Sequence, residues 1–134
     1  MELVEITSRR DALTSDIRDR AKNGSACGLT KKYSVREEGA EVGYVALDWY
    51  PLDACTDLIL YEMFVPEKFR HRGVGSRILA ATEELAGARG YSRVLLIARP
   101  LEDYPKGKLI EWYQERGFGA VPHACENAMA KNVS

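Results

Sequence analysis

The chain has 134 residues, of which 46% are apolar and 29% charged, and its formal net charge is −1. This length predicts one domain over residues 1–134 with a single core. Because acids and bases are interspersed, we expect neither nucleic acid nor a membrane as a partner. The three cysteines lack metal-ligand spacing, which argues against a disulfide framework and a metal site. No apolar run resembles a signal peptide, which predicts a soluble cytoplasmic protein.

The first half of the chain predicts strands around one helix. Residues 2–7 alternate as a strand does, and residues 11–22 predict a helix that ends at Asn23 and Gly24. Residues 32–36 and 41–49 predict the two strands of a hairpin.

The second half predicts a strand–helix–strand unit. An apolar strand is expected at 57–65, followed by a helix from residue 74 that Gly90 ends. The apolar run at 93–98 predicts a buried strand parallel to the 57–65 strand, joined by a right-handed crossover. A helix over 105–116 and one or two strands complete the chain. The expected class is α/β, with a mixed sheet flanked by helices.

The segment between that strand and that helix, residues 69–76, reads FRHRGVGS. Gly73 and Gly75 let the backbone turn with its N–H groups inward, and the helix that follows adds its positive dipole end. Arg70 and Arg72 add guanidinium donors suited to phosphate oxygens. The segment therefore predicts a phosphate-binding loop.

Two common nucleotide sites do not fit this loop. A nucleoside-triphosphate loop needs a lysine after its last glycine, where this chain has Ser76 and Arg77. A dinucleotide loop needs a third glycine, and Ile78 stands in its place.

The pattern Arg-x-x-Gly-x-Gly at 70–75, preceded by EMFVP at 62–66, resembles the pyrophosphate loop of the GNAT superfamily of N-acetyltransferases. Residues 112–118, WYQERGF, resemble that superfamily's Tyr-x-x-x-Gly-Phe segment. The resemblance covers residues 58–118 and implies the GNAT fold, a splayed sheet and acetyl-CoA as cosubstrate. It places the coenzyme pyrophosphate on Arg70, His71, Arg72, Gly73, Val74, Gly75 and Ser76. It places the pantetheine arm along the strand end at Met63, Phe64 and Val65.

Two catalytic candidates follow from the resemblance. Glu62 is the carboxylate inside an otherwise apolar strand, at a position resembling that of acidic residues that act as general base in several members. A cross-strand ion pair with a lysine or arginine is its alternative role. Tyr113 matches the tyrosine that donates a proton to the coenzyme thiolate, with packing in the core as its alternative.

The expected function is acetyl transfer from acetyl-CoA to a primary amine of a small molecule or peptide by direct attack. One alternative is a non-catalytic acyl-CoA-binding or regulatory module, and a second is a different transfer, with a longer acyl donor or a non-amine acceptor. The chain departs from the superfamily in lacking an asparagine between the 93–98 strand and Phe118, where Tyr104 and Lys106 are candidate replacements. One clear N-terminal helix, where many relatives have two, predicts an open acceptor cleft or one completed in a homodimer. Acidic residues that could line its mouth are Asp48, Asp53, Asp57, Glu102 and Asp103.

Overall fold

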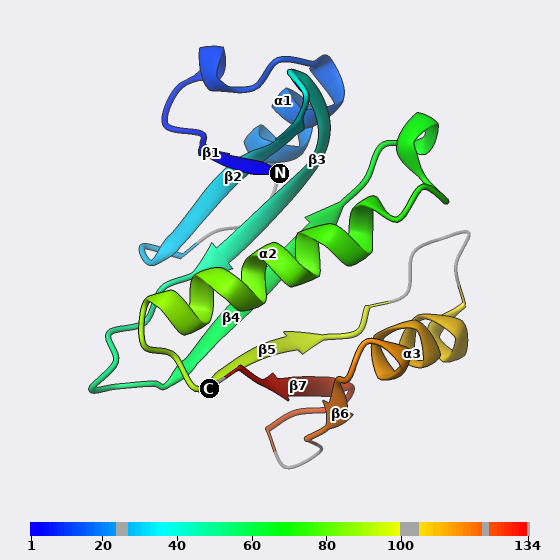
Figure 1. Ribbon diagram of the computed structural model, residues 1–134. Helices are drawn as coiled ribbons and strands as arrows, with labels where there is room; N and C mark the ends of the chain where they lie inside the picture. The colour runs from blue at the N-terminus through cyan, green and yellow to red at the C-terminus, as the bar shows by residue number, and fades with distance from the viewer. Residues whose placement is uncertain (24–26, 100–104, 122–123, 134) are drawn as a thin grey trace.

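A computed structural model describes residues 1–23, 27–99, 105–121 and 124–133, and shows one sheet with helices on both faces (Figure 1). The strands are β1 (Glu2–Glu5), β2 (Thr30–Glu37), β3 (Ala40–Asp48), β4 (Asp57–Phe64), β5 (Arg93–Ile97), β6 (Gly119–Ala120) and β7 (Ala128–Asn132). The helices are η1 (Arg9–Asp11, 3₁₀), α1 (Ser15–Asn23), η2 (Glu67–Phe69, 3₁₀), α2 (Val74–Ala88) and α3 (Lys106–Glu115). The strand order is β1-β2-β3-β4-β5-β7-β6. The predicted mixed α/β class is confirmed, and β4 and β5 are parallel as expected.

The first α-helix begins at Ser15, four residues later than residues 11–22 predict. The reason is a carboxylate from another element. Glu41 at the start of β3 accepts hydrogen bonds from the backbone N–H groups of Leu13 and Thr14, each at 2.8 Å. These bonds hold the chain just before the helix, where backbone N–H groups lack partners within the helix. Glu41 therefore anchors α1 to the sheet.

The sheet separates two apolar clusters, with α2 and α3 on one face and α1 on the other (Figure 1). The α2 face holds the larger cluster, in which Ile78 and Leu79 of α2 are fully buried against strand residues including Leu58, Leu60, Val94 and Leu96. On the opposite face, Ile17 of α1 packs against Tyr44 and Ala46. None of the described helices is long and apolar enough to span a membrane.

The parallel pair β4 and β5 separates towards its C-terminal end. Pairing runs from Asp57–Arg93 to Leu60–Leu96 and stops there, although β4 continues to Phe64. The two strands diverge beyond that point (Figure 1). This is the splay that the GNAT resemblance implies, and it leaves the end of β4 without its neighbour on one side.

A β-bulge lies at the start of this splay. Leu60 is paired with Leu47 of β3, whereas Glu62 is paired with Ala46, so Tyr61 is the extra residue. Regular alternation after Leu60 would direct Glu62 into the apolar cluster under α2. The bulge instead places Glu62 on the face that α1 covers.

Candidate functional site

The predicted phosphate loop leads into the N-terminus of α2. Gly73 is the N-cap residue, with a left-handed φ of 76° that glycine adopts without steric strain. In the described part of the chain no side chain caps the helix, and its first turn holds no acidic residue. The first N–H groups of a helix have no partners within it, and they carry the positive end of its dipole. This helix start is therefore suited to an anion.

The second predicted block, residues 112–118, packs against this helix start. A Cβ atom added at Gly75 would lie 3.2 Å from Cζ2 of Trp112 in α3, closer than ordinary van der Waals contact. The Arg116 guanidinium lies 3.8 Å over the Trp112 ring and donates a hydrogen bond to the Ser76 hydroxyl at 2.7 Å. Both sequence blocks therefore belong to one structural unit, in which α3 fixes the start of α2.

Two arginines shape the loop from within. Arg70 donates from Nε to the backbone carbonyl of Val65 at 2.9 Å. Arg77 forms two 2.8 Å hydrogen bonds to the Glu37 carboxylate and a third, at 3.0 Å, to the carbonyl of Arg72. Arg77 is a residue that the motif alone does not single out. Because Arg77 bonds both to Glu37 at the end of β2 and to the backbone of the loop at Arg72, it holds the loop against the β2–β3 turn.

The strand end predicted for the pantetheine arm lies in the splay. Met63 and Phe64 follow the last β4–β5 pair, and Val65 follows them out of the sheet. On the β5 side these residues have no ladder partner within the described chain. Backbone N–H and C=O groups in this position can pair with a ligand that carries amides, as an added strand would.

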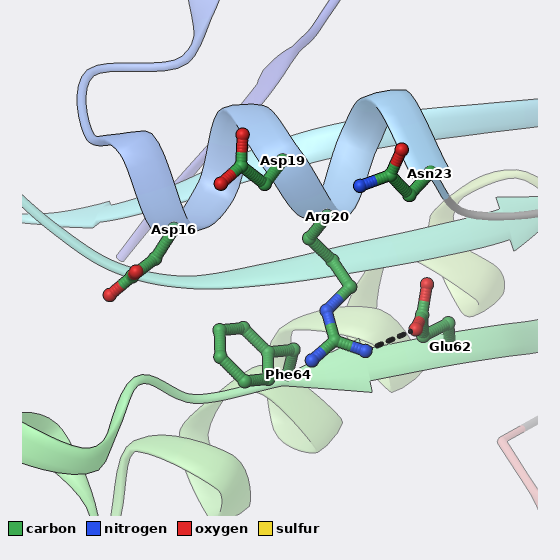
Figure 2. Close-up of a pocket in the computed structure, with 6 residues that line it drawn as sticks. All are labelled: Asp16, Asp19, Arg20, Asn23, Glu62 and Phe64. Carbon is green, nitrogen blue, oxygen red and sulfur yellow. Dashed lines mark hydrogen bonds and ion pairs between the residues drawn. The ribbon is translucent and has the colours of Figure 1, made fainter.

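A pocket with a cavity volume of about 330 Å³ lies between α1 and the end of β4 (Figure 2). Its lining residues are Asp16, Asp19, Arg20, Asn23, Glu62 and Phe64. The α1 residues follow helical spacing, so one polar stripe of that helix faces the pocket. Asp16 and Asp19 are exposed, and neither forms an ion pair within the described residues.

Glu62 has an ion-pair partner in this pocket, and it comes from a helix rather than from a neighbouring strand. Arg20 of α1 donates from a terminal guanidinium nitrogen to Oε2 of Glu62 at 3.0 Å. The same guanidinium lies 4.1 Å from the centre of the Phe64 ring (Figure 2). Ion pairing of Glu62 is thus observed, while its role as a base stays a prediction.

Tyr113 is 7% exposed and packs edge-on against two aromatic rings. The ring centroids lie 5.1 Å from Trp112 and 5.8 Å from Phe118. Burial raises the pKa of Tyr113 to about 12, so the hydroxyl keeps its proton at neutral pH. Among the described residues, that hydroxyl makes no hydrogen bond. The side chain therefore packs in the core and also carries a proton that it could donate.

The acids suggested for an acceptor mouth do not gather at this pocket. Both carboxylate oxygens of Asp57 accept hydrogen bonds from Arg93, at 2.9 Å each. The Asp48 carboxylate accepts a hydrogen bond from the Thr30 hydroxyl. Asp16 and Asp19 line the pocket instead. Their spacing of three residues on the predicted helix places them on one helix face, and this is the sequence feature that could have identified them. Glu102, Asp103 and Tyr104 lie outside the described residues, as does the side chain of Lys106. No group of three or more described His, Cys, Asp or Glu residues could hold a metal ion.

The sequence model of the acetyltransferase (GNAT) domain matches residues 30–119. The chain belongs to the GNAT acetyltransferase family. Membership supports acetyl transfer as its general activity and confirms the resemblance drawn from the two motifs. Among curated proteins, none matches the chain.

Solved structures share the GNAT fold at low sequence identity. The PaiA N-acetyltransferase of Thermoplasma acidophilum, in complex with coenzyme A, is 14% identical, with a TM-score of 0.59 over 87% of this chain and 67% of that one. Tetrahymena GCN5 is 9% identical, with a TM-score of 0.67 over 100% and 97%. The KacTA–DNA complex contains a chain that is 12% identical, with a TM-score of 0.72 over 98% and 92%. Because that neighbour is in a complex with DNA, the expectation of no nucleic-acid partner stays a prediction.

Proposed function

We propose that residues 1–134 form one GNAT domain that transfers the acetyl group of acetyl-CoA to a primary amine of a small molecule or peptide. The observation that carries this proposal is that the end of β4, unpaired on its β5 side within the described chain, lies next to the N-terminus of α2 along the chain. The β4–β5 ladder stops after Leu60–Leu96, and the β4 end then leads through a short loop into the uncapped start of α2. The open end of β4 suits the amides of a pantetheine arm, and the start of α2 suits the pyrophosphate of coenzyme A.

The chain's own groups would hold the cosubstrate as follows. Backbone N–H groups at the start of α2, from Gly73 to Ser76, would bind the pyrophosphate together with the exposed side chain of Arg72. His71 and Val74 would border it, and Arg70 would brace the loop through Val65. The backbone of Met63, Phe64 and Val65 would pair with the pantetheine arm. Acetyl-CoA, when bound, supplies the acetyl thioester.

Two side chains would move protons during the transfer. Glu62 would accept the proton that the attacking amine loses as its nitrogen bonds to the acetyl carbon. Tyr113, whose raised pKa keeps its hydroxyl protonated at neutral pH, would donate that proton to the thiolate released when the carbon–sulfur bond breaks. General acid–base catalysis by one placed group contributes on the order of 10² to 10⁴ in rate. Holding amine and thioester in line would supply much of the rest.

The acceptor would enter through the pocket between α1 and β4. Amines are cationic in solution, and the carboxylates of Asp16 and Asp19 are exposed there. Of the described helices, α1 lines this pocket, so a second copy of the chain could complete the cleft. Sedimentation of a monomer at working concentration would contradict that homodimer. We expect neither a metal nor a nucleic acid to take part.

Calorimetric titration with acetyl-CoA, followed by an assay of coenzyme A release with candidate amines, tests the proposal. Arg72→Ala should weaken acetyl-CoA binding, whereas Arg10→Ala, an exposed arginine of η1, should not. Binding without amine-dependent release would favour the acyl-CoA-binding module instead. A folded protein that does not bind acetyl-CoA would refute the proposal.

A further inference from the structure

Within the described structure, the Glu62 carboxylate is held through one of its two oxygens. Oε2 accepts the hydrogen bond from Arg20, while Oε1 accepts none within the described residues. Because Oε1 keeps its acceptor capacity, it is the atom available to a proton from a bound molecule. Because the two oxygens belong to one planar carboxylate, the group that fixes Oε2 also sets the direction in which Oε1 points.

Arg20 is itself fixed from two directions. It projects from α1, whose start is anchored to β3 by Glu41, and its guanidinium lies over the Phe64 ring beside Glu62 (Figure 2). A planar guanidinium can stack on a ring and donate to a carboxylate at once, which the ammonium of lysine cannot do with the same geometry. The Arg20 guanidinium therefore fixes the orientation of the Glu62 carboxylate as well as placing a positive charge beside it.

The other charged and titratable groups around Glu62 do not replace Arg20. On α1, Asp16 and Asp19 carry the same charge as Glu62 and cannot donate to it. Tyr44 of β3 has a fully buried hydroxyl with no hydrogen-bond partner among the described residues, and burial, with the charge of Glu62 adding to it, raises its pKa. Tyr61, beside Glu62 on β4, faces Arg99, whose guanidinium lies 5.3 Å over its ring. Arg20 is thus the described group that donates to Glu62.

We propose that Arg20 is a positioning residue, which holds Glu62 at the β4 bulge so that Oε1 faces the acceptor amine. This inference rests on the proposed function, because it gives Arg20 a role only if Glu62 is the base. The side chains of Arg20 and Glu62 are 37% and 26% exposed, so their ion pair contributes little to stability. Loss of Arg20 should therefore change turnover without unfolding the protein.

A double-mutant cycle on the full chain tests the proposal, comparing wild type, Arg20→Met, Glu62→Gln and the double variant. The readout is coenzyme A release from acetyl-CoA with spermidine, L-lysine or an aminoglycoside, and release to water if none of these reacts. We expect Arg20→Met to lower kcat roughly tenfold to a hundredfold while leaving the KM for acetyl-CoA and the unfolding midpoint unchanged. In the Glu62→Gln background it should lower kcat by less than about twofold. Arg20→Lys should restore only part of the rate.

Arg18 provides the matched control on the same helix. Its guanidinium donates to the carbonyls of Ala12 and Leu13, both at 3.3 Å, and it does not line the pocket. Arg18→Met should leave kcat unchanged. Equal losses from Arg20→Met in both backgrounds, or a matching loss in Arg18→Met, would overturn the positioning role. A wild-type protein without any turnover would overturn the proposed function itself, and an active Glu62→Gln variant would remove the base that Arg20 is proposed to position.

Discussion

Trp112 of α3 leaves little room for a side chain at Gly75 of α2. A single added carbon at Gly75 would lie 3.2 Å from the indole ring, and the Arg116 guanidinium, which lies 3.8 Å from the centre of that ring, restrains it. The glycine of the loop motif and the aromatic residue of the second motif therefore constrain each other. This packing gives a physical reason why the two sequence motifs occur together in the same chain.

We predict that Gly75→Ala lowers acetyl-CoA affinity about tenfold, because the helix start must shift to relieve the contact with Trp112. Stability should change little, since alanine gains up to about 1 kcal/mol of helix propensity over glycine, which offsets the crowding. Titration calorimetry and thermal unfolding measure the two quantities.

Gly87→Ala in the same helix is the control. Of the described atoms, a Cβ there would meet the carbonyl oxygen of Val133, at the ordinary contact distance of 3.5 Å. That variant should bind acetyl-CoA normally and gain roughly 0.5–1 kcal/mol in stability. If Gly75→Ala behaves in the same way, the Trp112 contact does not govern the site.

The Glu41 carboxylate gives a prediction about stability. It is 4% exposed and accepts hydrogen bonds from Ser34 and Thr14 hydroxyls as well as from the N–H groups of Leu13 and Thr14. Glu41→Ala should lower the free energy of unfolding by about 3 kcal/mol, because it leaves the buried Ser34 hydroxyl and the partly buried donors of Leu13 and Thr14 unpaired. Urea denaturation at neutral pH measures the loss, and an unchanged midpoint would show that α1 does not need this anchor.

Glu41 should also make stability depend on pH. Burial acts to raise its pKa, but the hydrogen bonds from Ser34, Thr14 and Leu13 outweigh it and lower the pKa below its ordinary value of 4.5. The folded state therefore binds this proton less readily than the unfolded state does. Its contribution is complete above pH 4.5 and is lost as the pH falls through the lower folded value. The stability difference between wild type and Glu41→Gln should shrink over that acidic range.

Tyr113→Phe separates catalysis from packing. The hydroxyl makes no described hydrogen bond, so its removal should leave the unfolding midpoint and acetyl-CoA affinity nearly unchanged. If the hydroxyl protonates the thiolate, turnover should fall by at least about tenfold. With a pKa of about 12, the wild-type rate should show no ionisation of this group up to about pH 9. Loss of stability in proportion to the loss of rate would favour the packing role.

The sequence predicts the elements whose causes are local and leaves out those that depend on distant residues. The turn before α2, the helix α2 and the parallel strand β5 follow from glycine placement and apolar periodicity within short windows. The start of α1 does not, because it depends on Glu41, which lies 28 residues from Leu13. The face of β4 on which Glu62 lies depends on the bulge at Tyr61, which is defined only by the register with β3. The Arg20 partner of Glu62 follows from both and could not be predicted without them.

Arg77 should control coenzyme binding without contributing much to stability. Its hydrogen bonds to Glu37 and to the carbonyl of Arg72 join the loop to the β2–β3 turn, yet its side chain is exposed and screened by solvent. Arg77→Met should therefore weaken acetyl-CoA binding several-fold and leave the unfolding midpoint close to that of wild type.

The variant Glu37→Gln tests whether Arg77 acts by bracing the loop or by attracting the phosphates with its charge. The amide can still accept one hydrogen bond from Arg77, so this variant should keep more affinity than Arg77→Met does. If Arg77 instead acts by attracting the phosphates directly, removing the nearby negative charge of Glu37 should tighten binding. Titration of both variants at low and high salt decides between these outcomes, because a direct phosphate contact weakens with salt more than a hydrogen-bonded brace does.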